Sequence, residues 1–224
     1  MMKMLKSVLK NKIRALSIFI VLVFVASDVL FASNVYNPIY FDMPSGPVVL
    51  KDMSLIVTGD SFAGKFCDME CNRELKVIPY AIAGQTIDQN KIIMAQALNF
   101  DEKNVMFSIG VNDMYVETFP FSFESVLREL MVIAEFNKKN VIMHSYLRFF
   151  SENYYEKKFD AFMYDSIIRK ICNEYENAYY IDVHDLERQE YISEDLMHYN
   201  KLFYDELYNR VFKLLYQLEA TTVK

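Results

Sequence analysis

Residues 54–63 read SLIVTGDSFA, a run of apolar and β-branched residues that ends in Gly59, Asp60 and Ser61. A run of this kind, closed by a glycine, is typical of a buried strand. It predicts a turn into a helix, in which the glycine gives the backbone freedom and the helix N-terminus favours nearby negative charge. The stretch therefore predicts a serine hydroxyl at the carboxyl end of a strand.

Four later runs have the same character and alternate with longer amphipathic segments. The expected strands are residues 54–58, 77–83, 105–109, 141–146 and 179–183. The expected helices include residues 86–99, 123–138, 159–176 and 200–218. This alternation predicts an α/β fold, with a five-stranded parallel sheet covered by helices on both faces. Ligands of such sheets bind at the carboxyl ends of the strands, so chemistry is expected just after each strand.

Length and composition indicate one domain with a sizeable core. The chain has 224 residues, of which 53% are hydrophobic, and its net charge is −6. These values exclude a disordered chain or a disulfide-stapled miniprotein. The first 33 residues carry five basic residues against Asp28, a local charge of +4, so the other 191 residues carry −10. A body this acidic repels phosphate backbones, and nucleic acid is not an expected partner.

The N-terminus has the order of a targeting segment. Five basic residues within residues 3–14 precede residues 15–26, ALSIFIVLVFVA, which carry no charge. Residues 1–33 are therefore expected to be a signal peptide or a membrane anchor, and both alternatives stay open because no clear cleavage site follows. A buried core helix is the third alternative, which the flanking charge disfavours. The basic end should stay in the cytoplasm, which places the rest of the chain outside it.

The start of the domain follows a proline-rich stretch. Residues 34–52 hold three of the five prolines and are expected to form a linker. The predicted domain therefore covers residues 53–224. If the targeting segment is not cleaved, the membrane is a partner of the chain through that segment.

The cysteines and histidines show no metal or cofactor motif. Cys67, Cys71 and Cys172 are expected to be packed free thiols, because a bridge between helical residues four apart would be strained. The nearest approach to a metal cluster is residues 182–185, Asp-Val-His-Asp, which is more simply an acidic strand end. No cofactor is expected.

Groups suited to acyl chemistry follow three of the strands and precede the last helix. Ser61 follows the first strand, and a serine hydroxyl becomes a nucleophile once a base takes its proton. Gly84 follows the second strand and Asn112 the third. A glycine N–H can approach a ligand closely and an asparagine amide is a neutral donor, so both suit an oxyanion hole. Asp195 and His198 are spaced so that one loop could present an acid and an imidazole.

Plainer interpretations of these residues stay open. Ser61 could be only the N-cap of its helix. His184, which is flanked by aspartates, is a rival general base. His144 is expected to be a structural histidine and Asp113 to brace its loop.

Together the groups resemble the sequence blocks of the SGNH hydrolases, also called GDSL esterases and lipases. The blocks are Gly59-Asp60-Ser61, Gly84, Gly110-Val111-Asn112-Asp113 and Asp195-Leu196-Met197-His198, in the order of the family and over residues 54–218. The resemblance implies a three-layer α/β/α, flavodoxin-like domain. It implies Ser61 as nucleophile, His198 as general base and Asp195 as its orienting acid. It also implies an oxyanion hole formed by the N–H groups of Ser61 and Gly84 and the side chain of Asn112.

The chain departs from the family pattern at two points. Phe62 replaces the leucine of the GDSL motif, and residues 144–150, HSYLRFF, lack the proline-bearing loop of many relatives, so the substrate does not follow by analogy. The expected activity is hydrolysis of small acyl esters, first of all O-acetyl groups on glycans, by an extracytoplasmic serine esterase that is membrane-anchored or secreted. The alternatives are an O-acyltransferase of envelope glycans with the same triad and a non-catalytic glycan-binding protein.

Overall fold

The computed structural model describes residues 53–68, 75–146, 161–194 and 198–222. The predicted targeting segment and linker, residues 1–52, lie outside these ranges, as do Cys71 and Asp195. Within the described ranges, no helix has both the length and the hydrophobicity needed to cross a membrane.

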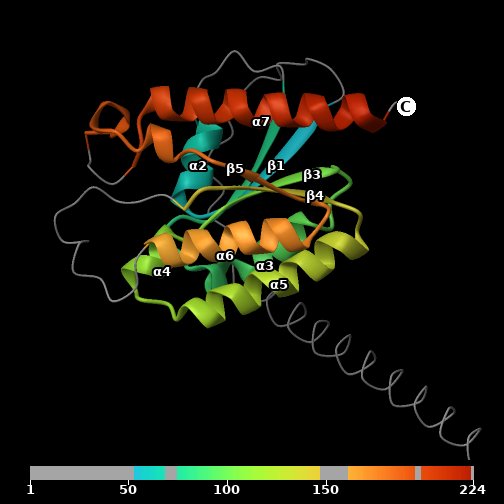
Figure 1. Cartoon of the computed structure of the whole chain (residues 1–224), viewed down its shortest axis with the longest axis horizontal. Coiled ribbons are helices and arrows are strands. Elements are labelled where there is room, and N and C mark those ends of the chain that lie inside the picture. The colour runs from blue at the N-terminus through green and yellow to red at the C-terminus, as the bar shows by residue number, and fades with distance from the viewer. Residues whose placement is uncertain (1–52, 69–74, 147–160, 195–197, 223–224) are drawn as a thin grey trace, which may run out of the picture. The chain divides into compact units, whose positions relative to one another are not determined.

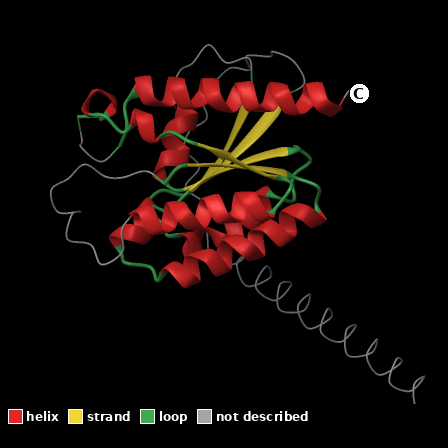
Figure 2. Ribbon diagram, in the orientation of Figure 1, coloured by secondary structure: helices red, strands yellow, loops and turns green. Residues whose placement is uncertain are grey.

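Five parallel strands form one sheet in the order β2-β1-β3-β4-β5 (Figures 1 and 2). The strands are β1 (Ser54–Gly59), β2 (Lys76–Ala81), β3 (Asn104–Ser108), β4 (Asn140–His144) and β5 (Ala178–Ile181). This order is flavodoxin-like and confirms the predicted fold class. The strand order reverses between β1 and β3, so the carboxyl ends of these two strands border the crevice in which a ligand is expected.

Helices cover both faces of the sheet. One face carries α2 (Ser61–Asp68) and α7 (Lys201–Thr222), and the other carries α3 (Ile87–Ala97), α5 (Pro120–Phe136) and α6 (Ala161–Glu174) (Figure 1). Helix α2 contacts α7, and α5 contacts both α3 and α6. The three-layer α/β/α arrangement implied by the resemblance is therefore present.

The central strands form the middle of the core. All residues of β3 are buried, and so is β1 from Leu55 onward. Continuous burial is what a strand covered on both faces requires, and it explains the unbroken apolar runs of the sequence. Strand β2 lies at one edge of the sheet, where the missing N–H of Pro79 is tolerated.

Three strands end two residues earlier than predicted. The strand expected over residues 77–83 ends at Ala81, the one over residues 141–146 at His144 and the one over residues 179–183 at Ile181. Each ends opposite the last residue of its partner, since Ala81 pairs with Gly59 and Ile181 with His144. A ladder cannot continue without a partner, so the following residues form the loops of the carboxyl edge.

The sequence patterns do not predict α4 (Val111–Tyr115) or the 3₁₀ turns η2 (His184–Leu186) and η3 (Gln189–Tyr191). These elements are five, three and three residues long, which is too short for a hydrophobic period to show. The predicted start of α3 is confirmed, because Thr86 is its N-cap and forms a reciprocal capping box with Gln89.

Candidate active site

Ser61 and His198 meet at the carboxyl edge of the sheet. Ser61 is the first residue of α2, directly after the turn that follows β1, and His198 lies shortly before α7. The Oγ of Ser61 lies 3.0 Å from Nε2 of His198. This distance allows proton transfer from the hydroxyl to the imidazole. Both residues are half-buried, so neighbouring residues pack against the pair while part of it stays exposed to solvent.

The turn that carries Ser61 is fastened to β3. Gly59 has a φ of 140°, and a Cβ at this position would collide with the carbonyl oxygen of Ser108. The next N–H, that of Asp60, donates to the same carbonyl at 3.1 Å. The N–H of Phe62 then donates to Oδ1 of Asp60 at 2.9 Å, which closes the turn into the helix. The first glycine of the motif is required because no other residue permits this approach.

Aromatic packing holds the two segments together. Phe62 and Tyr199, the residues that follow Ser61 and His198, are each 1% exposed, and their ring centroids are 6.0 Å apart. The Phe62 ring also lies 5.4 Å from the His198 ring. Tyr199 stacks on Phe203 of α7 with a centroid distance of 4.1 Å. The distance between serine and histidine therefore depends on buried rings as well as on their own hydrogen bond.

Backbone hydrogen bonds fix the segment that carries His198. Ile192 and Tyr199 form an antiparallel bridge, and the N–H of Ser193 donates to the carbonyl of His198 at 2.9 Å. The side-chain oxygen of Asn200 accepts hydrogen bonds from N–H groups in the first turn of α7. His198 is thus followed directly by a bridged residue, Tyr199, and by the cap of α7, Asn200.

The predicted oxyanion donors border the same edge. Gly84 is exposed and has a φ of 76°, a left-handed conformation that glycine adopts without strain. The amide nitrogen of Asn112 in α4 lies 3.1 Å from the Gln85 carbonyl and 3.5 Å from Oδ2 of Asp60. The second contact is long for a hydrogen bond. An oxyanion formed at Ser61 could replace it with a stronger bond.

Two buried carboxyl groups, those of Asp60 and Asp113, lie next to Ser61 and Asn112 in the chain. Burial raises the pKa of Asp60 to about 7, although the hydrogen bond from the Phe62 N–H lowers it, and the charge of Asp113 adds to the rise. Burial likewise raises the pKa of Asp113 to about 7, against the lowering effect of the Ile87 N–H. A pKa of about 7 leaves Asp60 partly protonated near neutral pH, which reduces its negative charge beside the amide of Asn112.

Asp113 braces its loop, as predicted. Its Oδ2 accepts a hydrogen bond from the N–H of Ile87 at 2.9 Å, and Ile87 is the first residue of α3. This bond ties the loop after β3 to the helix that follows Gly84. It therefore fixes the position of Asn112 relative to the segment that carries Gly84.

The other two histidines have different partners. Nδ1 of His184 lies 2.8 Å from Oδ1 of Asp182 and 3.4 Å from a guanidinium nitrogen of Arg169. Nε2 of His144 lies 2.8 Å from the Ser108 hydroxyl, and burial lowers the pKa of His144. Of the three histidines, it is His198 that the structure brings to Ser61.

The remaining site predictions have mixed outcomes. Asp195, the expected orienting acid, lies outside the described residues. Asp182 and Asp185, weighed above as metal ligands, pair instead with Arg169 at 2.9 Å and Arg210 at 2.7 Å. In the part of the chain that the structure describes, no group of three or more His, Cys, Asp or Glu side chains could hold a metal ion. Cys172 is a free thiol, as expected.

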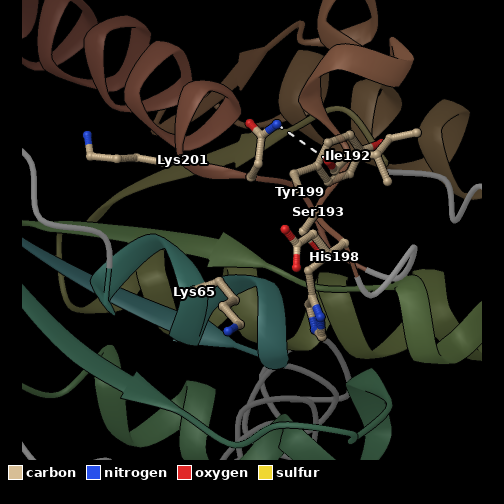
Figure 3. Close-up of a pocket in the computed structure, with 8 residues that line it drawn as sticks. Lys65, Ile192, Ser193, His198, Tyr199 and Lys201 are labelled. Carbon is tan, nitrogen blue, oxygen red and sulfur yellow. Dashed lines mark hydrogen bonds between the residues drawn. The ribbon is translucent and has the colours of Figure 1, made fainter.

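A pocket adjoins His198. Lys65 of α2 lines it together with residues around the start of α7, among them Tyr199, Asn200 and Lys201 (Figure 3). The sequence patterns do not single out Lys65. One signal could have found it, because a residue four positions after Ser61 lies on the same face of a helix.

Comparisons with known proteins agree with this arrangement. No protein-family model and no curated protein matches the sequence. Solved structures do match. A lipase/acylhydrolase from Enterococcus faecalis is 15% identical with a TM-score of 0.62, over 73% of this chain and 95% of that chain. A GDSL-like lipase from Bacteroides thetaiotaomicron is 16% identical with a TM-score of 0.61, over 74% of this chain and 88% of that chain.

An acetyl xylan esterase is 17% identical with a TM-score of 0.58, over 72% of this chain and 99% of that chain. At such identities the likeness concerns the fold. The topology, the layers and the position of the serine turn all match what the sequence blocks imply. The domain has the three-layer α/β/α fold of the GDSL-type, or SGNH, lipases, esterases and acylhydrolases.

Proposed function

We propose that this chain is a serine ester hydrolase that acts through an acyl-enzyme on Ser61. The observation that carries the proposal is the 3.0 Å contact between Oγ of Ser61 and Nε2 of His198. It occurs at the start of a helix and at the point where the strand order reverses, where ligands of such sheets bind. A serine that served only as a helix cap would not require an imidazole at its hydroxyl.

The reaction follows from the positions of these groups. His198 takes the proton of Ser61 as Oγ bonds to the ester carbonyl carbon, and the carbonyl oxygen becomes an oxyanion. The N–H groups of Ser61 and Gly84 and the amide of Asn112 stabilise this oxyanion. When the bond to the alcohol breaks, His198 gives its proton to the leaving oxygen. A water molecule deprotonated by His198 then attacks the acyl group, which releases a carboxylic acid and restores Ser61.

The proposed substrates are small acyl esters, with O-acetyl groups on glycans first. The acetyl xylan esterase among the similar structures supports acetyl as the acyl group. The proposed location is outside the cytoplasm, either membrane-anchored or secreted. The support for it is the basic and apolar order of residues 1–33.

The test combines turnover with covalent labelling. Full-length protein in detergent is given p-nitrophenyl acetate and longer-chain esters, and separately a fluorophosphonate that forms a stable bond with an activated serine. We expect turnover that is fastest for acetate, and a label that peptide mass spectrometry locates on Ser61. His198→Ala should abolish both, because the hydroxyl then lacks its base.

His184→Ala is the matched control, because His184 is the rival imidazole at the same sheet edge. It should keep labelling and turnover. Folded wild-type protein that neither turns over nor labels at Ser61 would overturn the proposal. Circular dichroism of each variant separates lost chemistry from lost fold.

A further inference from the structure

The pocket beside His198 holds a cation that the proposed reaction does not use. Its lining includes Lys65, His198 and Tyr199, and the Lys65 and His198 side chains both border the cavity (Figure 3). Ser61 and Lys65 are one helical turn apart on α2, and a helical side chain leans toward the preceding turn. The geometry thus brings an ammonium group to the neighbourhood of the reacting hydroxyl.

Lys65 differs from the second lysine of the pocket in its partners. Nζ of Lys201 binds Asp205, one turn further along α7, at 2.6 and 2.8 Å. Lys65 is half-buried, and it forms no salt bridge with any residue in the described ranges. The carboxyl of Glu194 also borders the pocket, but it belongs to an exposed residue. A cation near the proposed reaction site that has no salt-bridge partner among the described residues is suited to an anionic group of a ligand.

The position of the pocket indicates which half of an ester it would meet. The oxyanion donors Gly84 and Asn112 do not line it, whereas His198 does. In the proposed reaction His198 gives its proton to the leaving alcohol, so the alcohol lies on the His198 side of the carbonyl. The pocket with Lys65 therefore faces the alcohol half, and the acyl half lies on the other side.

We propose that Lys65 binds a carboxylate or another anionic group on the alcohol half of the substrate. The inference rests on the proposed esterase function and names its substrate class as esters of anionic alcohols. The chain beyond residue 33 carries a net charge of −10, which by itself would repel an anion. Such repulsion between exposed charges is screened beyond about 8 Å in physiological salt, so a local ammonium decides the affinity at the pocket.

The experiment compares two acetyl esters that differ in charge at one end of the alcohol. These are 4-acetoxybenzoate, which is anionic, and 4-acetoxybenzamide, which is neutral and of similar shape. The kcat/KM ratio of the two esters is measured for wild type, Lys65→Gln, Lys65→Arg and Lys201→Gln. Use of the ratio cancels the different intrinsic reactivities of the two esters.

We expect Lys65→Gln to lower the ratio of anionic to neutral ester by about fivefold to tenfold, mainly through KM, as for loss of a charged binding contact. Lys65→Arg should restore most of the ratio, because it keeps the charge. Lys201→Gln should keep the wild-type ratio. High salt, about 1 M, should reduce the wild-type preference toward that of Lys65→Gln. An unchanged ratio in Lys65→Gln would overturn the inference.

A binding measurement separates this inference from the proposed function. The product 4-hydroxybenzoate is titrated against Ser61→Ala protein and followed by saturation-transfer NMR, with 4-hydroxybenzamide as the neutral control. Binding of the anion that Lys65→Gln removes would support the anionic pocket even if no ester were turned over. Equal binding of anion and amide would overturn it even if ester hydrolysis were found.

Discussion

Two clusters at the carboxyl edge of the sheet contain a serine, a histidine and nearby carboxyl groups, and they differ in how their hydrogen bonds are filled. In the first, Ser61 contacts His198 and is half-buried. In the second, Ser145 is 0% exposed, accepts a hydrogen bond from the Val183 N–H at 2.7 Å and lies 3.2 Å from Asp182. Both sets of residue types could suggest catalysis, and only the first leaves its hydroxyl accessible.

The second cluster is an ion network. Arg169 donates to Asp165 at 2.8 Å and to Asp182 at 2.9 Å, and it lies over the Tyr180 ring. Burial alone would raise the pKa of Asp182, but hydrogen bonds from His184 and Arg169 outweigh burial and hold that pKa well below its usual range. The His184 imidazole has Asp182 and Arg169 as its neighbours in this network. Residue type therefore does not separate the Ser61 cluster from the Ser145 cluster, whereas the exposure of the serine does.

The largest expected effect is at the cluster of Ser61 and His198, where Ser61 is the proposed nucleophile. Ser61→Ala should lower kcat for p-nitrophenyl acetate by about 10⁴-fold or more, because the nucleophile is removed and only binding and oxyanion stabilisation remain. Its free energy of unfolding should change by less than about 0.5 kcal/mol, as for an accessible side chain without a structural bond. Stopped-flow kinetics and urea unfolding measure the two quantities. A large stability loss would identify Ser61 as a structural cap.

The same substitution in the other cluster should have the reverse pattern. Ser145→Ala should lower the free energy of unfolding by about 1–3 kcal/mol, because the buried Val183 N–H loses its acceptor. The value of kcat should stay within about twofold of wild type, since no reacting group is removed. If Ser145→Ala abolished turnover in a folded protein, the distinction between the two clusters would be wrong.

The carboxyl groups behind the two clusters should give stability opposite dependences on pH. The pKa of Asp113 is raised to about 7 from 3.8, so the folded state binds more protons than the unfolded state between these values. Stability should therefore fall as pH rises from about 4 through about 7. Asp113→Asn should remove on the order of 3 kcal/mol of this fall, because the pKa differs by about three units at about 1.4 kcal/mol each, while the amide oxygen can still accept from Ile87. Urea unfolding at about pH 4.5 and about pH 8 measures it.

Asp182 provides the contrast. Its lowered pKa contributes stability that is present above 3.8 and lost as pH falls through the folded value. Asp182→Asn should therefore change the acid side of the stability profile and leave the fall between about pH 4 and about pH 7 in place. If Asp113→Asn and Asp182→Asn changed stability over the same pH range, the environments of the two carboxyl groups would not differ as described.

Much of the fold was predictable, because both faces of the central strands are covered and their sequences become unbroken apolar runs. The strand ends were less predictable, since Ala81 and Ile181 end where a partner strand ends, far away in the sequence. Helix α4 has five residues and leaves no periodic signal.

The candidate site shows the same limit. Ser61, Gly84 and Asn112 could be found by their places after strands. The choice of His198 over His184 rested on the family's block order, because both have aspartates nearby in the sequence. Lys65 and the contact of Asn112 with Asp60 depend on which loops come together, and no local pattern encodes that. Short motifs therefore predict the residues around Ser61 in part, but they do not predict how those residues pack.

That packing leads to the smallest expected effect, at the position where this chain departs from the GDSL pattern. Phe62→Leu removes the ring that lies 5.4 Å from His198 and 6.0 Å from Tyr199. A smaller residue that refills most of the space should cost about 1 kcal/mol of stability. It should also lower kcat about threefold to tenfold, because a loosened imidazole spends less time in line with Ser61.

Phe66→Leu is the matched control, one turn further along α2. Phe66 is also 1% exposed, but its ring packs on Tyr208 of α7 with a centroid distance of 6.4 Å. It should lose similar stability and keep kcat. If both variants lowered kcat equally, the loss would reflect a general loosening of α2 against α7. If only Phe62→Leu did so, Phe62 positions His198. The Ser61 cluster would then depend on a buried aromatic contact, whereas the Ser145 cluster depends on ion pairs.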